Sequence, residues 1–162
     1  MSADLEKRIA RLEAVEEIKK LKSRYAQACD DAYNPETMRT IFTKDAVWDG
    51  GDVFGKHVGQ DAVCEFFASV SSQIVWALHY MIAPEIEIGD DGTTATGTWY
   101  IWMAFTGASE GDPQAGWVAG LYSDVYRLEP EGWRISALKI DLQIMSPYED
   151  GWAKTPFMSE QR

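Results

Sequence analysis

Hydrophobic residues recur every three or four positions along the first thirty residues of the chain, and charged residues lie between them. This spacing is typical of an amphipathic helix, which we expect from about Leu5 to Ala28. The pattern also allows a break near residue 13, which would separate an N-terminal arm, residues 1–13, from the main helix. The apolar positions are Leu5, Ile9, Leu12, Val15, Ile18, Leu21, Tyr25 and Ala28.

Two further helices are predicted downstream. Asn34-Pro35-Glu36 is typical of a helix start, with Asn as N-cap, Pro at the first helical position and an acid in the first turn. The segment Asp61–Val70 has its large apolar residues on one side, which also indicates a helix. Between them, Ala46–Trp48 is expected as a strand, and Asp49–Asp52 as the turn of a hairpin.

The period of the pattern changes from Leu78 onward, where four strand-like segments follow one another. They are Leu78–Ile88, Thr93–Phe105, Trp117–Leu128 and Trp133–Met145. Helices followed by an antiparallel meander indicate one α+β domain over residues 1–162. Strands of this length would form a strongly curved sheet, which the helices close into a cone around a hydrophobic cavity.

Composition and charge narrow the possible partners. The 162 residues fit one domain, and the formal charge of 15 − 26 = −11 disfavours nucleic acid, because an acidic surface repels phosphate. Cys29 and Cys64 lie in apolar stretches and are expected to be reduced thiols. There is no leader-like start and no apolar run of 18 residues, so we predict a cytoplasmic protein without membrane contact.

Aromatic residues are the one compositional feature that bears on function. Seven Trp, seven Tyr and six Phe make an aromatic-lined pocket plausible, although an ordinary aromatic core is the commoner explanation. The only two histidines are far apart in the sequence, and no zinc-like or facial-triad spacing is present, so we expect no metal. No Gly-rich loop lies between a strand and a helix, which disfavours nucleotide binding.

Several motifs together resemble a known family. The segments Ile18–Asp30 and Phe42–Trp48, then Leu78-His79-Tyr80 and Gly132–Ile135, occur in the order and spacing of the SnoaL-like branch of the nuclear-transport-factor-two-like (NTF2-like) superfamily. Within it the chain is most similar to scytalone dehydratase, bile-acid 7α-dehydratase and hexachlorocyclohexane dehydrochlorinase. The resemblance implies elimination of water or HCl from a hydrophobic cyclic substrate without metal or cofactor. It also implies a homo-oligomer, with a trimer favoured over a dimer.

The same resemblance implies the catalytic residues. The family's His–Asp dyad falls on His79 and Asp30, and a hydroxyl donor falls on Tyr25. Neutral imidazole is a natural base near physiological pH, and a carboxylate bonded to its other nitrogen orients the ring. A lone strand histidine is otherwise most often a core or rim residue. The second histidine, His57, falls in a predicted surface loop, and Asp31 competes with Asp30 for the carboxylate role.

The helix itself places a condition on this assignment. On an ideal helix Tyr25 and Asp30 point about 140° apart. Both can face one cavity only if the helix ends near Cys29 or if the long tyrosine reaches around.

Further residues are predicted to bind substrate. Strand alternation leaves two choices of face for most of them. The family alignment places Trp99, Ile101 and Met103 on the inward face. Lys139 and Asp141 share one strand face, and they form an ion pair in the cavity if that face is concave or are solvated charges if it is convex. The predicted substrate-binding residues are Trp48, Phe54, Trp99, Ile101, Met103, Lys139 and Asp141.

The functional hypothesis is a cofactor-independent lyase acting on a hydrophobic, aromatic or polycyclic hydroxylated compound, with loss of water as the default reaction. The alternatives are a C–C lyase that releases a small aldehyde such as formaldehyde from a lignin-derived diol, an isomerase, and a non-catalytic binding or assembly module. The aromatic tail, residues 146–162, is expected to cover the cavity mouth or to contact a neighbouring subunit.

Overall fold

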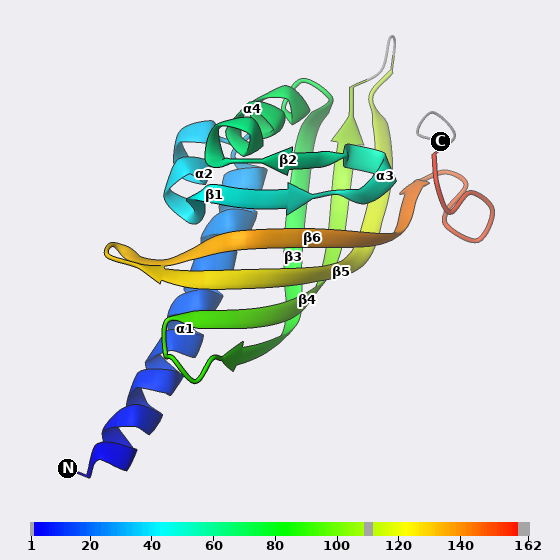
Figure 1. Ribbon diagram of the computed structural model, residues 1–162. Helices are drawn as coiled ribbons and strands as arrows, with labels where there is room; N and C mark the ends of the chain where they lie inside the picture. The colour runs from blue at the N-terminus through cyan, green and yellow to red at the C-terminus, as the bar shows by residue number, and fades with distance from the viewer. Residues whose placement is uncertain (1, 109–111, 159–162) are drawn as a thin grey trace.

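The computed structural model describes residues 2–108 and 112–158. Its four helices and six strands follow one another in the order shown in Figure 1. The helices are α1 (Ala3–Asp30), α2 (Pro35–Ile41), α3 (Gly51–Phe54) and α4 (Gln60–Val70). The strands are β1 (Phe42–Asp49), β2 (Lys56–Val58), β3 (Ile74–Ile88), β4 (Thr94–Gly107), β5 (Gln114–Glu129) and β6 (Gly132–Pro147).

Helix α1 is continuous, and the break that the sequence pattern allowed near residue 13 does not occur. The segment contains no Gly or Pro, and nothing in it interrupts helix propagation once Ser2 has capped the first turn. Only the second half of the helix is buried, through residues such as Ile18, Leu21 and Tyr25. The first half projects beyond the sheet, as Figure 1 shows, and leaves Leu12 68% exposed.

The start of α2 agrees with the sequence prediction. The Asn34 side chain accepts hydrogen bonds from the backbone N–H groups of Glu36 and Thr37, at 3.1 and 3.2 Å. The turn that precedes it is unusual, because Ala32 and Tyr33 both have positive φ, of 51° and 57°. Neither residue type favours this left-handed region, so the surrounding packing must hold the turn in place.

The predicted hairpin after β1 is replaced by a different connection. Residues Gly51–Phe54 form the helical turn α3 and not a returning strand, and the antiparallel partner of β1 is the shorter β2. Gly51 and Gly55, with φ of 62° and 73°, supply the left-handed conformations at the two ends of this turn. The consequence is that Phe54 leaves the sheet and lies against the ring of Trp48.

The six strands form one mixed sheet in the order β2-β1-β6-β5-β4-β3. All neighbouring pairs are antiparallel except β1 and β6, which run parallel. Register shifts occur between Ala119 and Gly120 and between Val125 and Tyr126, where bulges increase the twist of a strand. Helices α1 and α4 pack against the sheet (Figure 1), and the expected α+β cone is confirmed.

The concave face carries the core, and the convex face carries a second set of aromatic side chains. On β4, Trp99, Ile101 and Met103 are buried, whereas Tyr100 is 55% exposed. Along the described chain, none of the helices has the length and apolar character needed to cross a membrane.

Candidate active site

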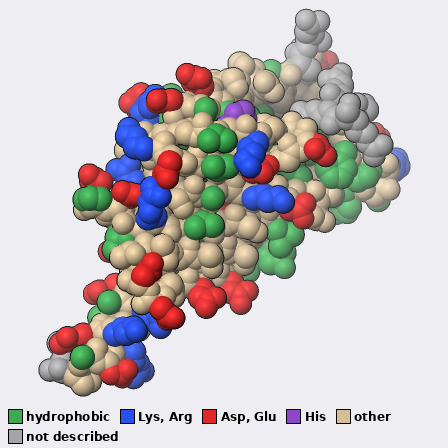
Figure 2. Space-filling view, in the orientation of Figure 1, with side chains coloured by type: hydrophobic (Ala, Val, Ile, Leu, Met, Phe, Trp, Pro, Cys, Tyr) green, Lys and Arg blue, Asp and Glu red, His purple; other side chains and the backbone are tan. Residues whose placement is uncertain are grey.

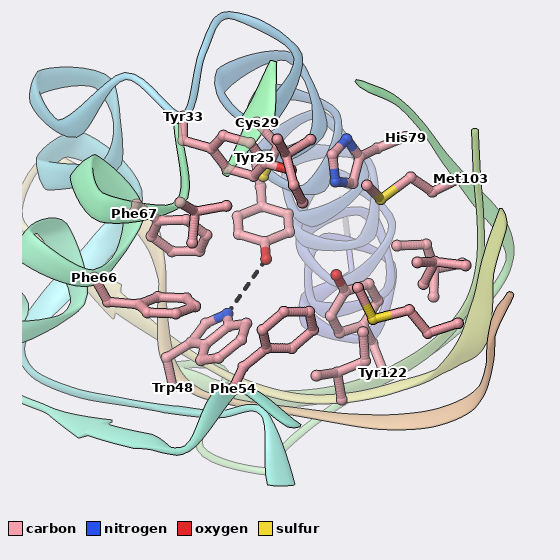
Figure 3. Close-up of a pocket in the computed structure, with 16 residues that line it drawn as sticks. Tyr25, Cys29, Tyr33, Trp48, Phe54, Phe66, Phe67, His79, Met103 and Tyr122 are labelled. Carbon is pink, nitrogen blue, oxygen red and sulfur yellow. Dashed lines mark hydrogen bonds between the residues drawn. The ribbon is translucent and has the colours of Figure 1, made fainter. Parts of the chain in front are cut away.

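A small apolar cavity of about 50 Å³ lies between the concave face of the sheet and helices α1 and α4. Figure 3 shows that its walls come from elements far apart in the chain. α1 supplies Tyr25 and Cys29, β3 supplies His79, and β5 supplies Tyr122. Most of the remaining wall consists of aromatic, methionine and branched aliphatic side chains.

His79 and Asp30 meet at the edge of this cavity. Asp30 is the last residue of α1, and its Oδ1 lies 2.7 Å from His79 Nδ1. The same oxygen accepts the backbone N–H of His79 at 2.9 Å. The His79 side chain is 5% exposed and lines the cavity, whereas Asp30 is 26% exposed and lies behind the ring. A carboxylate accepts hydrogen bonds, so Nδ1 carries the proton and Nε2 is the basic nitrogen.

Tyr33 holds the other side of the histidine ring, a contact that sequence reasoning missed. Its ring lies edge-on to His79, with centroids 5.9 Å apart, and stacks on Phe67 at 6.0 Å. The left-handed turn at Ala32 and Tyr33 brings the ring to this place. No glycine or asparagine marks these two positions in the sequence, so no local signal could have revealed the turn.

Tyr25 points into the cavity from the middle of α1 and is 1% exposed. Its hydroxyl accepts a hydrogen bond from Trp48 Nε1 at 3.3 Å and also interacts with the hydroxyl of Tyr122. Burial is the largest cause that raises the pKa of Tyr25 well above its ordinary value, so the hydroxyl keeps its proton at neutral pH.

Tyr25 and Asp30 reach the site from two sides of its wall. The helix ends at Asp30, one residue after Cys29, which agrees with the end near Cys29 that the helix geometry required. Tyr25 faces the interior of the cone, while Asp30, at the end of the helix, reaches His79 from outside the cavity wall. The two side chains therefore serve one site although they point in different directions.

Tyr122 is a second tyrosine of the cavity wall that the sequence did not single out. It lies on β5, and its ring centroid is 6.1 Å from that of Tyr25. Both hydroxyls point into the cavity in Figure 3. Burial raises the pKa of Tyr122, as it does for Tyr25. The alternation of β5 puts Tyr122 on the inner face with Val118, which was the available signal.

The predicted substrate-binding residues separate into two groups. Trp48, Phe54, Ile101 and Met103 line the cavity, as expected from their position. Trp99 is also on the inner face but lies outside the wall, where its Nε1 donates to the Tyr126 hydroxyl at 2.9 Å.

Lys139 and Asp141 require a correction. Both are exposed on the convex face of β6, because the inner face of this strand is taken by Leu138 and Ile140. Asp141 accepts a hydrogen bond from Gln143 at 2.9 Å, and Ile140 is the residue of this segment that lines the cavity. No ion pair from β6 therefore enters the cavity.

The two competing residues, His57 and Asp31, lie elsewhere. His57 is in β2 and not in a loop, and its ring stacks on Phe66 with centroids 4.2 Å apart. It is not among the residues of the cavity wall. Asp31 is exposed and accepts a hydrogen bond from the Asn34 side chain at 3.3 Å.

A larger outer cavity of about 750 Å³ adjoins the inner one. The two share Phe54, Phe66, Val70, Ile74 and Met145 as lining residues. The outer cavity is more polar, and the C-terminal tail forms part of its wall. Backbone hydrogen bonds from Met145 to Pro156 and from Met158 to Met145, both 2.9 Å, attach the tail to β6.

The inner cavity has no built-in charge at its wall. No Lys, Arg, Asp or Glu side chain is among its lining residues, and in the described part of the chain no three His, Cys, Asp or Glu side chains are grouped so that they could hold a metal ion. The buried Cys29 thiol at the wall has a pKa raised by burial, so it stays protonated. The arrangement thus offers one base, the neutral tyrosines Tyr25, Tyr33 and Tyr122, and an apolar surface.

Comparisons with known proteins agree with this architecture. A SnoaL-like domain matches residues 10–139. No curated protein sequence matches the chain. A crystal structure from Novosphingobium aromaticivorans, provisionally described as an aromatic ring hydroxylase, is 28% identical, with a TM-score of 0.76, and the match covers 86% of this chain and 96% of that one.

Two other solved structures share the fold at lower identity. A hexachlorocyclohexane dehydrochlorinase, LinA-type3 from Novosphingobium barchaimii, is 20% identical with a TM-score of 0.74, over 86% of this chain and 92% of that one. A protein from Novosphingobium aromaticivorans, provisionally described as a scytalone dehydratase, is 16% identical with a TM-score of 0.76, over 86% and 90%. With the domain match across most of its length and this fold, the chain belongs to the SnoaL-like domain family.

Proposed function

We propose that the protein is a cofactor-independent lyase that eliminates water from a hydrophobic hydroxylated compound. The observation that carries the proposal is the 2.7 Å contact between Asp30 and His79 Nδ1, which leaves the second ring nitrogen for the cavity. A non-catalytic binding module would have no need of a carboxylate behind the imidazole. The similarity to a dehydrochlorinase and to a protein described as a scytalone dehydratase supports the same reaction class.

In this proposal His79 is the general base. Its Nε2 takes a proton from a carbon of the substrate, and the electron pair of that C–H bond forms the new double bond. The C–O bond on the neighbouring carbon breaks, and the leaving oxygen takes the proton back from the imidazolium and departs as water. Asp30 stabilises the imidazolium formed in between and keeps the proton of the resting ring on Nδ1.

Tyr25 is the hydrogen-bond donor of the reaction. Its hydroxyl accepts from Trp48 Nε1 and interacts with the Tyr122 hydroxyl at the cavity wall, where a substrate oxygen could replace that partner as acceptor. A buried neutral donor of this kind stabilises negative charge that develops on a substrate oxygen, and the apolar wall strengthens the effect by excluding water.

The two cavities support a substrate with a compact reactive end and a larger remainder. The inner volume of about 50 Å³ accommodates only a small group beside His79 and Tyr25. The remainder would extend past Phe66 and Met145 into the outer cavity, where Ser69, Gln73 and Gln114 can bind polar substituents. Such a shape fits a hydroxylated aromatic or polycyclic compound.

We also propose that the protein is a homo-oligomer, with a trimer favoured. Large hydrophobic side chains are exposed side by side on the convex face of β3 and β4, including Trp76, Tyr80, Ile82 and Tyr100. Ile82 and Tyr100 are register partners, so these side chains form a continuous apolar surface. A soluble monomer rarely leaves such a surface uncovered.

The experiment that tests the function uses both histidines. The purified protein is incubated with a panel of hydroxylated aromatic compounds, and loss of water is followed by mass spectrometry. We expect turnover by the wild type, loss of it in His79→Gln, and near wild-type turnover in the matched control His57→Gln. Binding of panel compounds without any turnover would establish a binding module, and equal activity of His79→Gln would exclude His79 as the base; either result would overturn the proposal.

A further inference from the structure

A fully buried ion pair lies next to the cavity wall and has no part in the mechanism described above. Lys22 Nζ is 2.7 Å from Asp124 Oδ2, and both side chains are 0% exposed. Burial is the largest cause that lowers the pKa of Lys22, and the Asp124 carboxylate opposes that shift. Stability alone does not explain the pair, because apolar residues of similar volume often serve a fold equally well.

The ammonium group is placed against two of the three cavity tyrosines, Tyr25 and Tyr122. Lys22 Nζ lies 3.7 Å from the ring centroid of Tyr122 and 4.8 Å from that of Tyr25, within the range of cation–π contacts. The hydroxyls of the same two rings point into the cavity (Figure 3). The positive charge is therefore presented to the cavity through the two rings and not by direct contact.

A chain of hydrogen bonds keeps the ion pair in this position. Trp99 Nε1 donates to the Tyr126 hydroxyl at 2.9 Å, and that hydroxyl donates to Asp124 Oδ2 at 2.6 Å. The other carboxylate oxygen, Asp124 Oδ1, is buried without a hydrogen-bond partner in the described structure. All these side chains are buried, so the charge is fixed in place before any substrate enters.

We propose that Tyr122 is a second hydroxyl donor beside Tyr25, and that Lys22 is a positioning residue that makes the two hydroxyls an oxyanion site. The substrate class is then an enolisable carbonyl compound, whose oxygen gains negative charge as His79 removes the proton from the neighbouring carbon. This inference rests on the proposed function, because the oxyanion is the counterpart of the proton that His79 takes. In the part of the chain described, no Lys, Arg, Asp or Glu side chain lines the inner cavity, and Lys22 lies behind the wall.

The test uses nitrophenols, whose phenol and phenolate forms absorb at different wavelengths, so that binding and ionisation are read without turnover. Spectra are recorded in the His79→Gln background, where the base cannot ionise the ligand. We expect the phenolate to bind about tenfold more tightly than the phenol, and Tyr122→Phe to reduce that ratio several-fold. The double variant Lys22→Met/Asp124→Asn, which removes both charges together, is expected to abolish the preference, whereas exposed Lys20→Met leaves it unchanged.

Several results would overturn the inference. These are equal binding of phenol and phenolate, no binding of either, or an unchanged preference in Tyr122→Phe or in the double variant. A double variant that fails to fold would assign the ion pair to folding and count against its positioning role. Each of these outcomes is independent of the turnover lost in His79→Gln, so failure of the oxyanion site is distinguishable from failure of the lyase proposal.

Discussion

A single carboxylate oxygen of Asp30 accepts both the backbone N–H and the Nδ1–H of His79, at 2.9 and 2.7 Å. The first bond fixes where β3 passes the end of α1, and the second fixes the rotation and tautomer of the ring. Strand position and ring chemistry therefore depend on the same atom.

Replacing Asp30 by Asn tests this double role. The amide oxygen can still accept the backbone N–H, but the carboxylate charge that stabilises an imidazolium is gone. We expect kcat to fall about a thousandfold with the fold unchanged. The measurement is steady-state turnover together with circular dichroism, and the exposed neighbour Asp31→Asn is the control. Similar losses of kcat in Asp30→Asn and Asp31→Asn would show that the two carboxylates act only through their negative charge and not through the bond to His79.

Tyr25→Phe separates the hydroxyl from the ring. Removing the hydroxyl takes away the donor to the substrate and also leaves the buried Trp48 N–H without its acceptor. We expect turnover to fall about a hundredfold and the free energy of unfolding to fall by about 1–2 kcal/mol.

A double-mutant cycle with Trp48→Phe distinguishes the two effects of this substitution. If the stability loss comes from the orphaned indole N–H, the double variant loses less stability than the sum of the single variants. Additive losses would show that the 3.3 Å contact contributes no stability. The loss of turnover is expected to remain in the double variant, because it depends on the hydroxyl alone.

The sequence predicted the elements that have strong local signals. The Asn34-Pro35 start of α2 is where its capping residues indicate, and the inward set Trp99, Ile101 and Met103 follows from strand alternation once the family alignment has chosen the face. Lys139 and Asp141 could not be assigned in this way, because alternation alone does not say which strand face is concave. That choice is made by packing against helices distant in sequence.

The parts that could not be predicted depend on contacts between distant segments. Tyr33, whose backbone is in the left-handed region, contacts His79 and Phe67. Tyr122 contacts Lys22, and the partners in each of these contacts are far apart along the chain. Periodicity places Tyr122 on a face but not beside a buried ammonium. Lys22 falls among the charged residues of an amphipathic helix, and a pattern argument therefore puts it in solvent.

Gly120 lies on β5 opposite the bulge that β6 forms at Gln143, and it is predicted to be essential to that bulge. A Cβ at this position would lie 2.4 Å from the backbone oxygen of Asp141, and that oxygen belongs to a paired strand that cannot move freely. We expect Gly120→Ala to lower the free energy of unfolding by about 3 kcal/mol in urea titrations. At Gly116 the obstacle is the side-chain ring of Phe105, which can rotate, so Gly116→Ala is the milder comparison. Equal losses would mean that the bulge is not the constraint.

The exposed apolar face of β3 and β4 leads to a prediction about assembly. Three chains of 18.2 kDa give 3 × 18.2 = 54.6 kDa, which light scattering resolves from a monomer. We expect the wild type near the trimer mass and Ile82→Glu/Tyr100→Glu at the monomer mass, because burying two carboxylates in an apolar interface is unfavourable.

The control for assembly is Glu65→Lys, an exposed charge change on α4. It is expected to leave the mass unchanged. A monomeric wild type would contradict the prediction directly. The exposed apolar face of β3 and β4 would then have to be covered by another partner. The tail lies near one end of this convex face, where Trp152 contacts Trp102 and Figure 2 shows hydrophobic side chains gathered.

Stability is expected to fall steeply in alkaline solution. Burial raises the pKa of Tyr25, Tyr33, Tyr122 and Tyr126, so the folded chain keeps these protons where the unfolded chain has lost them. Their contribution is complete below the ordinary tyrosine pKa of about 10 and is lost as the pH rises above it. The lowered pKa of Lys22 acts in the opposite direction, but only below the ordinary lysine value of about 10.4.

Urea titrations between pH 7 and pH 11 measure this loss. Each buried tyrosine contributes a slope of up to about 1.4 kcal/mol per pH unit once the unfolded chain is fully ionised. Tyr33→Phe removes one such group without removing the Tyr25–Trp48 bond and is expected to make the slope shallower by that amount. The exposed Tyr148→Phe is the matched control and should leave the slope as in the wild type. A wild-type stability that stays constant through pH 11 would contradict the burial of these hydroxyls, and with it the apolar character assigned to the cavity.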